Sequence, residues 1–158
     1  MAPLFTGEAF MDLPRKGQPV DVFYLPFNEN WPASIQGNFL NSYWADEAFR
    51  PGYKTSLFNA FRAFAGHIEK KGWKNTRFQF YLNNKVYYRT KNTASRAPWV
   101  FDEPENIQDF WALRWYGKLW KAATAGAVDN IKLEYRCDIS YGDYKRNILD
   151  GIMDAEYM

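Results

Sequence analysis

The segment Ile131-Lys132-Leu133-Glu134-Tyr135-Arg136-Cys137-Asp138-Ile139 alternates strictly between apolar and charged residues. This period of two predicts a β-strand over 131–139 with one apolar and one charged face. Helices cover both faces of a doubly wound sheet, so a charged second face does not suit that fold. The interior of a (β/α)8 barrel commonly holds the working polar residues near its C-terminal mouth. An edge strand with one solvent-exposed face explains the same pattern, and this segment alone leaves both alternatives open.

The rest of the chain predicts further strands and amphipathic helices in alternation. Short apolar runs indicate strands, and apolar residues repeating every three or four positions indicate helices. Residues 1–19 are rich in proline, glycine and charge and predict irregular structure. The predicted elements are, in order, strand 20–26, helix 53–71, strand 77–82, helix 104–123, strand 131–139, helix 144–153 and strand 155–158.

This alternation implies parallel strands joined by right-handed crossovers. No G-x-G-x-x-G turn follows any predicted strand, so the usual sign of a nucleotide-binding sheet is missing. We therefore expect an α/β fold, namely a partial (β/α)8 TIM-type barrel of about three βα units. A complete barrel needs roughly 250 residues. Residues 1–158 are accordingly expected to form a single segment of a longer barrel protein.

Composition narrows the classes of function. The net charge of +2 provides no electrostatic footprint for nucleic acid or an anionic membrane, and neither partner is expected. With one cysteine and one histidine, no ordinary zinc site can form, and we expect no cofactor. The sequence shows neither a signal-peptide pattern nor a membrane span. The cellular location stays open, with a secreted or periplasmic parent protein among the options.

Two neighbouring acids, Asp102 and Glu103, stand between the apolar run 99–101 and the predicted helix 104–123. Pro104 suits the first helical position, and Asp102 would then lie at or near the N-cap. Capping accounts for one acid only, because one cap needs one side chain. The second acid leaves a chemical role open beside the capping role.

Polar and aromatic residues follow the predicted strands, where a barrel places its ligand site. Carboxylates, amides and tryptophans of this kind suit a site that cleaves carbohydrates. The sequence leaves open whether Glu29 contacts substrate or forms a loop salt bridge, and whether Trp31 and Trp99 bind sugar or pack in loops. The candidate substrate-binding residues are Glu29, Asn30, Trp31, Asn83, Asn84, Lys85, Trp99, Arg136 and Asp138, and the candidate catalytic residues are Asp102 and Glu103.

Five segments of the chain, taken together and in this order, carry a resemblance to a known family. They are Phe23-Tyr24-Leu25-Pro26-Phe27-Asn28-Glu29-Asn30-Trp31-Pro32, Lys71-Gly72-Trp73, Phe80-Tyr81-Leu82-Asn83-Asn84-Lys85, Pro98-Trp99-Val100-Phe101-Asp102-Glu103-Pro104 and Arg136-Cys137-Asp138-Ile139-Ser140. The chain resembles, from about residue 3 to 154, the barrel domain of glycoside hydrolase family 123 and its uncharacterised bacterial relatives.

The resemblance implies retaining hydrolysis of a β-linked N-acetylhexosaminide by substrate-assisted catalysis. Asp102 would orient the 2-acetamido group of the sugar, and Glu103 would act as general acid and then base. Burial beside Trp99 and Phe101 is expected to keep Glu103 protonated. Activity is expected of the complete barrel, and the 158-residue chain alone is expected to be inactive. The alternatives are a non-catalytic carbohydrate-binding or structural barrel fragment and, less compatible with the charge, a single-stranded nucleic-acid-binding protein.

Overall fold

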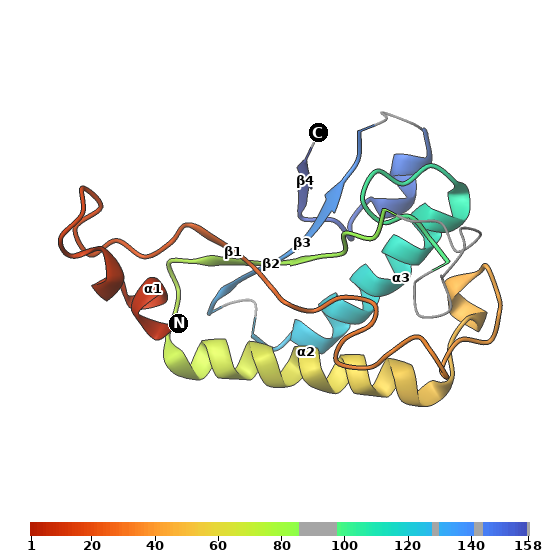
Figure 1. Ribbon diagram of the computed structural model, residues 1–158, viewed down its shortest axis with the longest axis horizontal. Helices are drawn as coiled ribbons and strands as arrows, with labels where there is room; N and C mark the ends of the chain where they lie inside the picture. Colours follow the sequence, from red (N-terminus) through yellow and green to blue (C-terminus); the bar gives the residue numbers. More distant parts are fainter. Residues whose placement is uncertain (86–97, 128–129, 141–143, 158) are drawn as a thin grey trace.

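The computed structural model describes residues 1–85, 98–127, 130–140 and 144–157. Four parallel strands form one sheet in the order β1-β2-β3-β4 (Figure 1). The strands are β1 (Val22–Tyr24), β2 (Arg77–Tyr81), β3 (Lys132–Asp138) and β4 (Ala155–Tyr157). The predicted α/β class and parallel strands are confirmed, and each strand is adjacent in space to the next strand in sequence.

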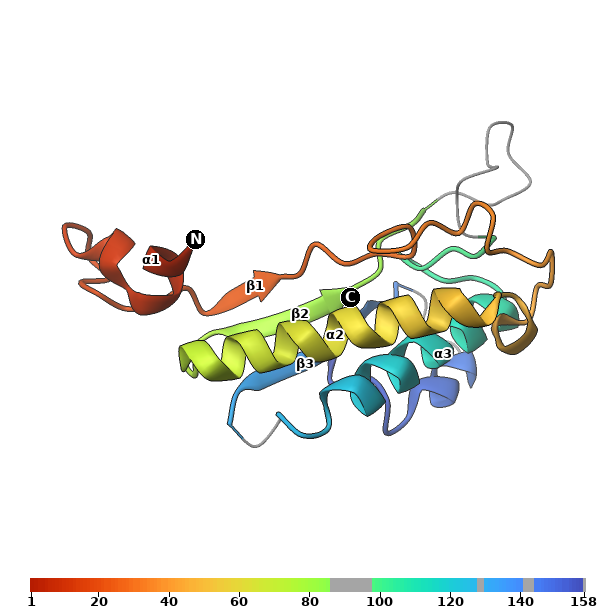
Figure 2. The same cartoon turned by 90° about the horizontal axis from the view of Figure 1, so that it is seen from below.

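Two long helices, α2 (Pro51–Lys71) and α3 (Ile107–Thr124), run side by side along the sheet (Figure 2). The core between the helices and the strands is mostly aromatic. Phe61 of α2 and Trp120 of α3 both pack on Phe80 of β2, with ring centroids 4.8 and 5.2 Å apart. Tyr135 of β3 donates its hydroxyl to the carbonyl of Leu113 in α3 at 2.8 Å. These contacts bury the apolar face of the sheet beneath the helices.

The opposite face of the sheet is polar. Tyr24, Gln79 and Glu134 lie in register across three strands. Gln79 donates its amide to the Glu134 carboxylate at 2.7 Å, and Arg77 lies 3.8 Å from the other oxygen of that carboxylate. The edge-strand explanation of the charged residues in β3 is wrong, because β2 and β4 pair with β3 on both sides.

The start of α3 differs from the prediction. The helix begins at Ile107 with Asn106 as N-cap, and Asn106 and Asp109 form a capping box. Pro104 therefore precedes the helix, and Asp102 is not the cap. By contrast, α2 ends as expected at Gly72, which adopts the left-handed conformation (φ 68°) that glycine tolerates best.

Short helices account for the other differences from the predicted elements. The N-terminal region contains α1 (Ala2–Thr6) and the 3-10 helix η1 (Glu8–Phe10), so it is not wholly irregular. This region projects beyond the end of the sheet (Figure 2). The long connection after β1 contains η2 (Ala45–Glu47), and the predicted helix 144–153 is the 3-10 helix η3 (Tyr144–Leu149).

Candidate functional site

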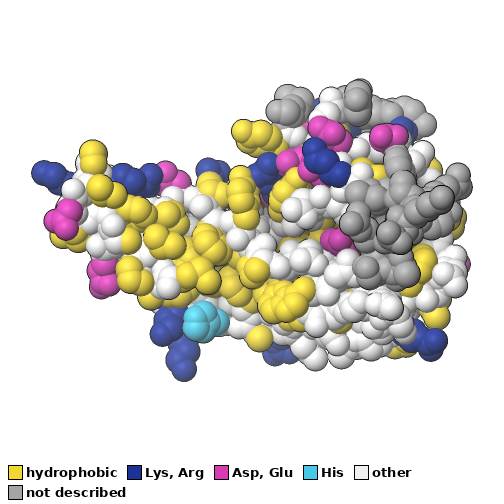
Figure 3. Space-filling model, viewed as in Figure 1, with side chains coloured by type: hydrophobic (Ala, Val, Ile, Leu, Met, Phe, Trp, Pro, Cys, Tyr) yellow, Lys and Arg dark blue, Asp and Glu magenta, His cyan; other side chains and the backbone are white. Residues whose placement is uncertain are grey.

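The Asp102–Glu103 pair lies in a loop that crosses the C-terminal ends of β2 and β3. The backbone carbonyl of Asn84, just after β2, accepts the N–H groups of Phe101 at 2.7 Å and Asp102 at 3.3 Å. The backbone N–H of Glu103 donates to the carbonyl of Asp138, at the end of β3, at 3.1 Å. The loop is therefore bonded to the segment that follows β2 and to the end of β3. Figure 3 shows acidic and basic side chains close together in the upper part of that view.

Glu103 has a left-handed backbone conformation, with φ 62°. This conformation is uncommon for residues other than glycine and costs about 1 kcal/mol or more. It persists only where surrounding contacts determine it, and such residues cluster at functional sites.

Asp109 holds the loop from the helix side. Its buried carboxylate accepts the backbone N–H groups of Val100 at 3.1 Å, Glu105 at 3.2 Å and Asn106 at 2.8 Å. Burial raises the pKa of Asp109, and these hydrogen bonds oppose that effect. Asp109 was not among the predicted residues, although the spacing of Asn106 and Asp109 is that of a capping box.

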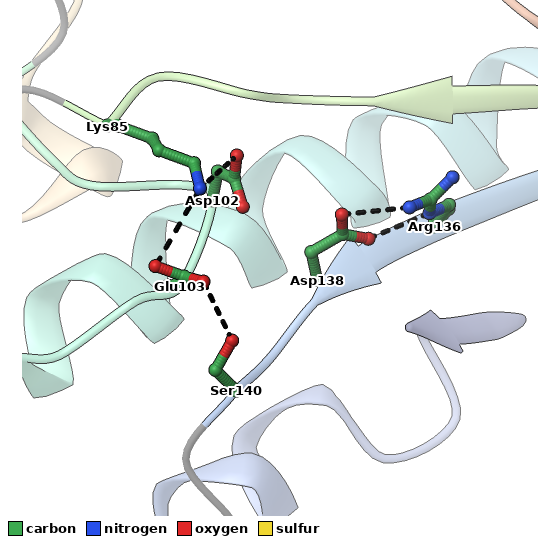
Figure 4. Close-up of polar contacts among 6 residues, drawn as sticks. All are labelled: Lys85, Asp102, Glu103, Arg136, Asp138 and Ser140. Carbon is green, nitrogen blue, oxygen red and sulfur yellow. Dashed lines mark hydrogen bonds and ion pairs between the residues drawn. The ribbon is translucent and has the colours of Figure 1, made fainter. Parts of the chain in front are cut away.

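The two carboxylates of the pair share one cation (Figure 4). Lys85 Nζ lies 3.2 Å from Asp102 Oδ2 and 3.7 Å from Glu103 Oε2. Ser140 donates its hydroxyl to Glu103 Oε1 at 2.9 Å. The hydrogen bond and charge of Asp102, with a smaller effect of Glu103, raise the pKa of Lys85, so this side chain stays cationic.

The members of the pair differ in exposure. The Asp102 side chain is 14% exposed and that of Glu103 is 46% exposed. Trp99 and Phe101 lie in the core, so the described residues do not give Glu103 the burial expected from its neighbours. Glu103 is thus the carboxylate that solvent or a ligand reaches more easily.

Arg136 and Asp138 lie beside the pair, as predicted (Figure 4). Arg136 Nε and Nη2 donate to the two carboxylate oxygens of Asp138 at 2.7 and 2.8 Å. Arg136 Nη1 donates to the hydroxyl of Tyr24. Burial lowers the pKa of Arg136, but Asp138 outweighs that effect and the net shift is upward.

Tyr81, the last residue of β2, belongs to the same cluster and was not predicted. Burial, followed by the charges of the nearby Asp138 and Asp102 carboxylates, raises the pKa of its phenol. Tyr81 is in register with Arg136, so it stands on the polar face of the sheet. The alternation along the predicted strand 77–82 is the signal that could have found it.

Glu29, Asn30 and Trp31 form a separate turn after β1. Glu29 is only 7% exposed, and its Oε2 atom has no hydrogen-bond partner among the described residues. Its Oε1 atom accepts a long hydrogen bond of 3.5 Å from Asn30. Burial raises the pKa of Glu29. Within the described ranges, no ion pair engages Glu29 and no hydrogen bond joins this turn to the Asp102–Glu103 pair.

The turn is held by two buried hydroxyl groups. Tyr53 donates to the backbone carbonyl of Glu29 at 2.5 Å, and the hydroxyls of Tyr53 and Tyr116 lie 2.7 Å apart. Trp31 stacks on Phe27 with 5.1 Å between ring centroids and is 49% exposed. Trp31 is therefore the predicted tryptophan that a ligand can reach.

Trp99 and Asn84 support the loop instead. Trp99 is fully buried and donates its indole N–H to the carbonyl of Tyr43 at 2.7 Å. The side-chain amide of Asn84 donates to the carbonyl of Trp99 at 2.7 Å. Packing, rather than sugar stacking, is thus the observed role of Trp99. Asn83 is exposed after β2.

Among the described residues, no cluster of His, Cys, Asp and Glu could hold a metal ion. No helix within those ranges is long and apolar enough to cross a membrane. A cavity of about 530 Å³ is lined by Trp44, Asp46, Glu47, Ile107, Trp111 and Ile148, and neither Asp102 nor Glu103 lines it.

The cluster has the parts needed for acid–base chemistry on a polar ligand. Glu103 is the more accessible carboxylate, and Asp102 lies closer to Lys85. Both carboxylates contact the same ammonium, so they converge on one point. Comparison with protein families, with curated proteins and with solved structures finds no match to this chain.

Proposed function

We propose that this chain is part of a (β/α)8 barrel that hydrolyses a β-linked N-acetylhexosaminide, with Glu103 as general acid and base. The observation that carries the proposal is the pair itself. Two adjacent carboxylates lie on a loop bonded to Asn84, beyond the C-terminal end of β2, and to Asp138 at the C-terminal end of β3, and they share the Lys85 ammonium. Catalytic residues of barrel enzymes stand at this end of the strands.

The topology supports a barrel over a doubly wound sheet. Strand order follows sequence order without reversal, whereas a doubly wound sheet reverses its order at a switch point. The face of the sheet opposite the helices carries Gln79, Glu134 and Arg136, which suits a barrel interior better than a second helical layer. The remaining strands would come from the rest of the barrel.

The arrangement of the acids supports substrate assistance. A nucleophile and an acid in a retaining glycosidase flank the scissile bond about 5–5.5 Å apart. Asp102 and Glu103 instead converge on Lys85, on one side. If the acetamido oxygen of the sugar is the nucleophile, Asp102 need only orient that group. Glu103 must break its contact with Lys85 before it can protonate the leaving-group oxygen of the sugar. The Lys85 side chain is 58% exposed, so Lys85 has room to turn away from Glu103.

The test uses Glu103→Gln and Asp102→Asn in the complete barrel protein, with aryl 2-acetamido-2-deoxy-β-glycosides as substrates. Loss of the acid should lower the rate by about 10²–10⁴-fold, and less for good leaving groups. Glu105→Gln is the matched control, because Glu105 is an exposed acid of the same loop. Undiminished activity of Glu103→Gln, or equal turnover of sugars that lack the acetamide, would disprove the assignment.

A second candidate is a barrel that binds carbohydrate without cleaving it. The exposed Trp31, stacked on Phe27, favours this alternative because it provides an aromatic platform apart from the acids. Sugar binding would then survive Glu103→Gln and be lost in Trp31→Ala. Hydrolysis by the unmodified protein would exclude this candidate.

A further inference from the structure

The guanidinium of Arg136 lies inside a ring of tyrosines. Its central carbon is 4.9 Å from the ring centroid of Tyr24, 4.8 Å from that of Tyr81 and 4.5 Å from that of Tyr157. These rings come from β1, β2 and β4, and Arg136 comes from β3. The four strands of the sheet therefore meet at this one side chain.

All three side-chain nitrogens of Arg136 donate hydrogen bonds. Nε and Nη2 bind the Asp138 carboxylate, and Nη1 binds the Tyr24 hydroxyl. The side chain is 9% exposed. Arg136 thus has little surface with which to bind a sugar, although the sequence suggested that role.

Asp138 connects this ring to the candidate catalytic loop. Its carboxylate is fixed at both oxygens by Arg136, and its backbone carbonyl accepts the N–H of Glu103 at 3.1 Å. Asp102 and Asp138 also form a parallel bridge. Glu103, with its left-handed backbone, depends on such contacts to keep its conformation.

We propose that Arg136 is a positioning residue, which fixes Asp138 and thereby holds the backbone of Glu103 in its strained conformation. Pairing of β4 contributes through Tyr157. The role of Glu103 rests on the proposed function, whereas the mechanical link between Arg136 and Glu103 does not. The link can be tested without any sugar.

The experiment measures amide hydrogen exchange by NMR in the 158-residue chain. Arg136→Met removes the paired hydrogen bonds and the charge while keeping a long apolar side chain. Exchange of the Glu103 amide should become about tenfold faster or more, since a charged hydrogen-bonded pair is lost. The amide of Phe101 is the internal reference, because it belongs to the same loop but donates to Asn84 at 2.7 Å. Its exchange should stay within about threefold.

Arg77→Met is the matched control. Arg77 is a half-exposed arginine of the same sheet and lies 3.8 Å from Glu134 rather than near Asp138. This variant should leave the Glu103 amide unchanged. An unchanged Glu103 amide in Arg136→Met would overturn the proposal, as would equal acceleration at Phe101 and along the β2–β3 ladder, which would indicate general loosening.

Arg136→Lys keeps the test decisive if Arg136→Met fails to fold. Lysine retains the charge but cannot form two parallel bonds to Asp138. Exchange at Glu103 should still accelerate relative to Phe101, and an unchanged ratio would overturn the proposal. In the complete enzyme the same variant should lower kcat with little change in KM. Hydrogen exchange tests the link between Arg136 and Glu103, whereas the glycosidase assay tests the proposed function. Either proposal can therefore fail while the other holds.

Discussion

The carboxylate of Asp109 accepts the backbone N–H of Val100 at 3.1 Å, which joins the loop carrying Asp102 and Glu103 to the first turn of α3. The same carboxylate completes the cap of that helix. One buried side chain therefore serves both the helix start and the candidate site.

Asp109→Ala should lower the free energy of unfolding by about 2–4 kcal/mol, because it removes a cap and leaves buried N–H groups without partners. Urea unfolding followed by circular dichroism measures this change. Asp150→Ala is the control, since Asp150 is exposed, and should stay within about 0.5 kcal/mol. Equal losses in the two variants would contradict the importance of the Asp109 contacts.

Glu29 should make the stability depend on pH. Burial raises its pKa in the native state, so its contribution to stability is fully present below the unfolded value of 4.5 and is lost as the pH rises through the native value. Glu29→Gln should gain stability relative to the unmodified protein as the pH rises from 4.5. Each pKa unit between the native and unfolded values corresponds to about 1.4 kcal/mol.

Unfolding midpoints between pH 4 and 8 measure the effect of Glu29→Gln. The control is Glu8→Gln, which changes an exposed glutamate in η1. If the two variants differ from the unmodified protein by the same amount at every pH, Glu29 is not the group responsible.

Gly117 and Gly66 should respond in opposite ways to alanine. A Cβ atom at Gly117 would lie 2.4 Å from Ile152 and 2.5 Å from the Tyr135 ring, whereas one at Gly66 meets nothing within 4 Å. Gly117→Ala should therefore destabilise the protein by about 1–3 kcal/mol despite the better helix propensity of alanine. Gly66→Ala should stabilise it by about 0.5–1 kcal/mol. Thermal or urea unfolding of both alanine variants measures these changes in stability. A stabilised Gly117→Ala variant would refute the close contact of α3 and β3.

Cys137 should be inert in the native protein. Its side chain is 1% exposed, and burial raises the pKa of its thiol to about 12. Reaction with an aromatic disulfide reagent at pH 8 should be at least about 10³-fold slower than in denaturant, because labelling requires opening of the sheet. Adding Ser56→Cys, at an exposed position of α2, should give one rapidly labelled thiol. Rapid labelling of the unmodified protein would show that β3 opens readily.

The charge alternation in β3 and the apolar periodicity of α2 were sufficient to predict an α/β chain with parallel strands. These signals are local, because a side chain's face is set by its position within one strand or helix. The polar face of β3 followed from the alternation along that strand. The rule that ligands meet the loops after the strand ends placed Lys85, Asp102, Glu103 and Asp138 in one candidate site.

Only the tertiary structure decided the path of the loop before α3 and the uses of Arg136 and Trp99. Asn106 and Asp109 form a local capping box, but Asp109 also binds Val100 across the loop, a contact that local propensity does not contain. Arg136 is enclosed by rings from three other strands, and Trp99 bonds to Tyr43 from the connection after β1. The sequence by itself determined the order of the strands and the two long helices and which of their residues share a face. Contacts between residues far apart in the chain decided which of those side chains remain accessible, because burial and hydrogen bonding are properties of the assembled fold.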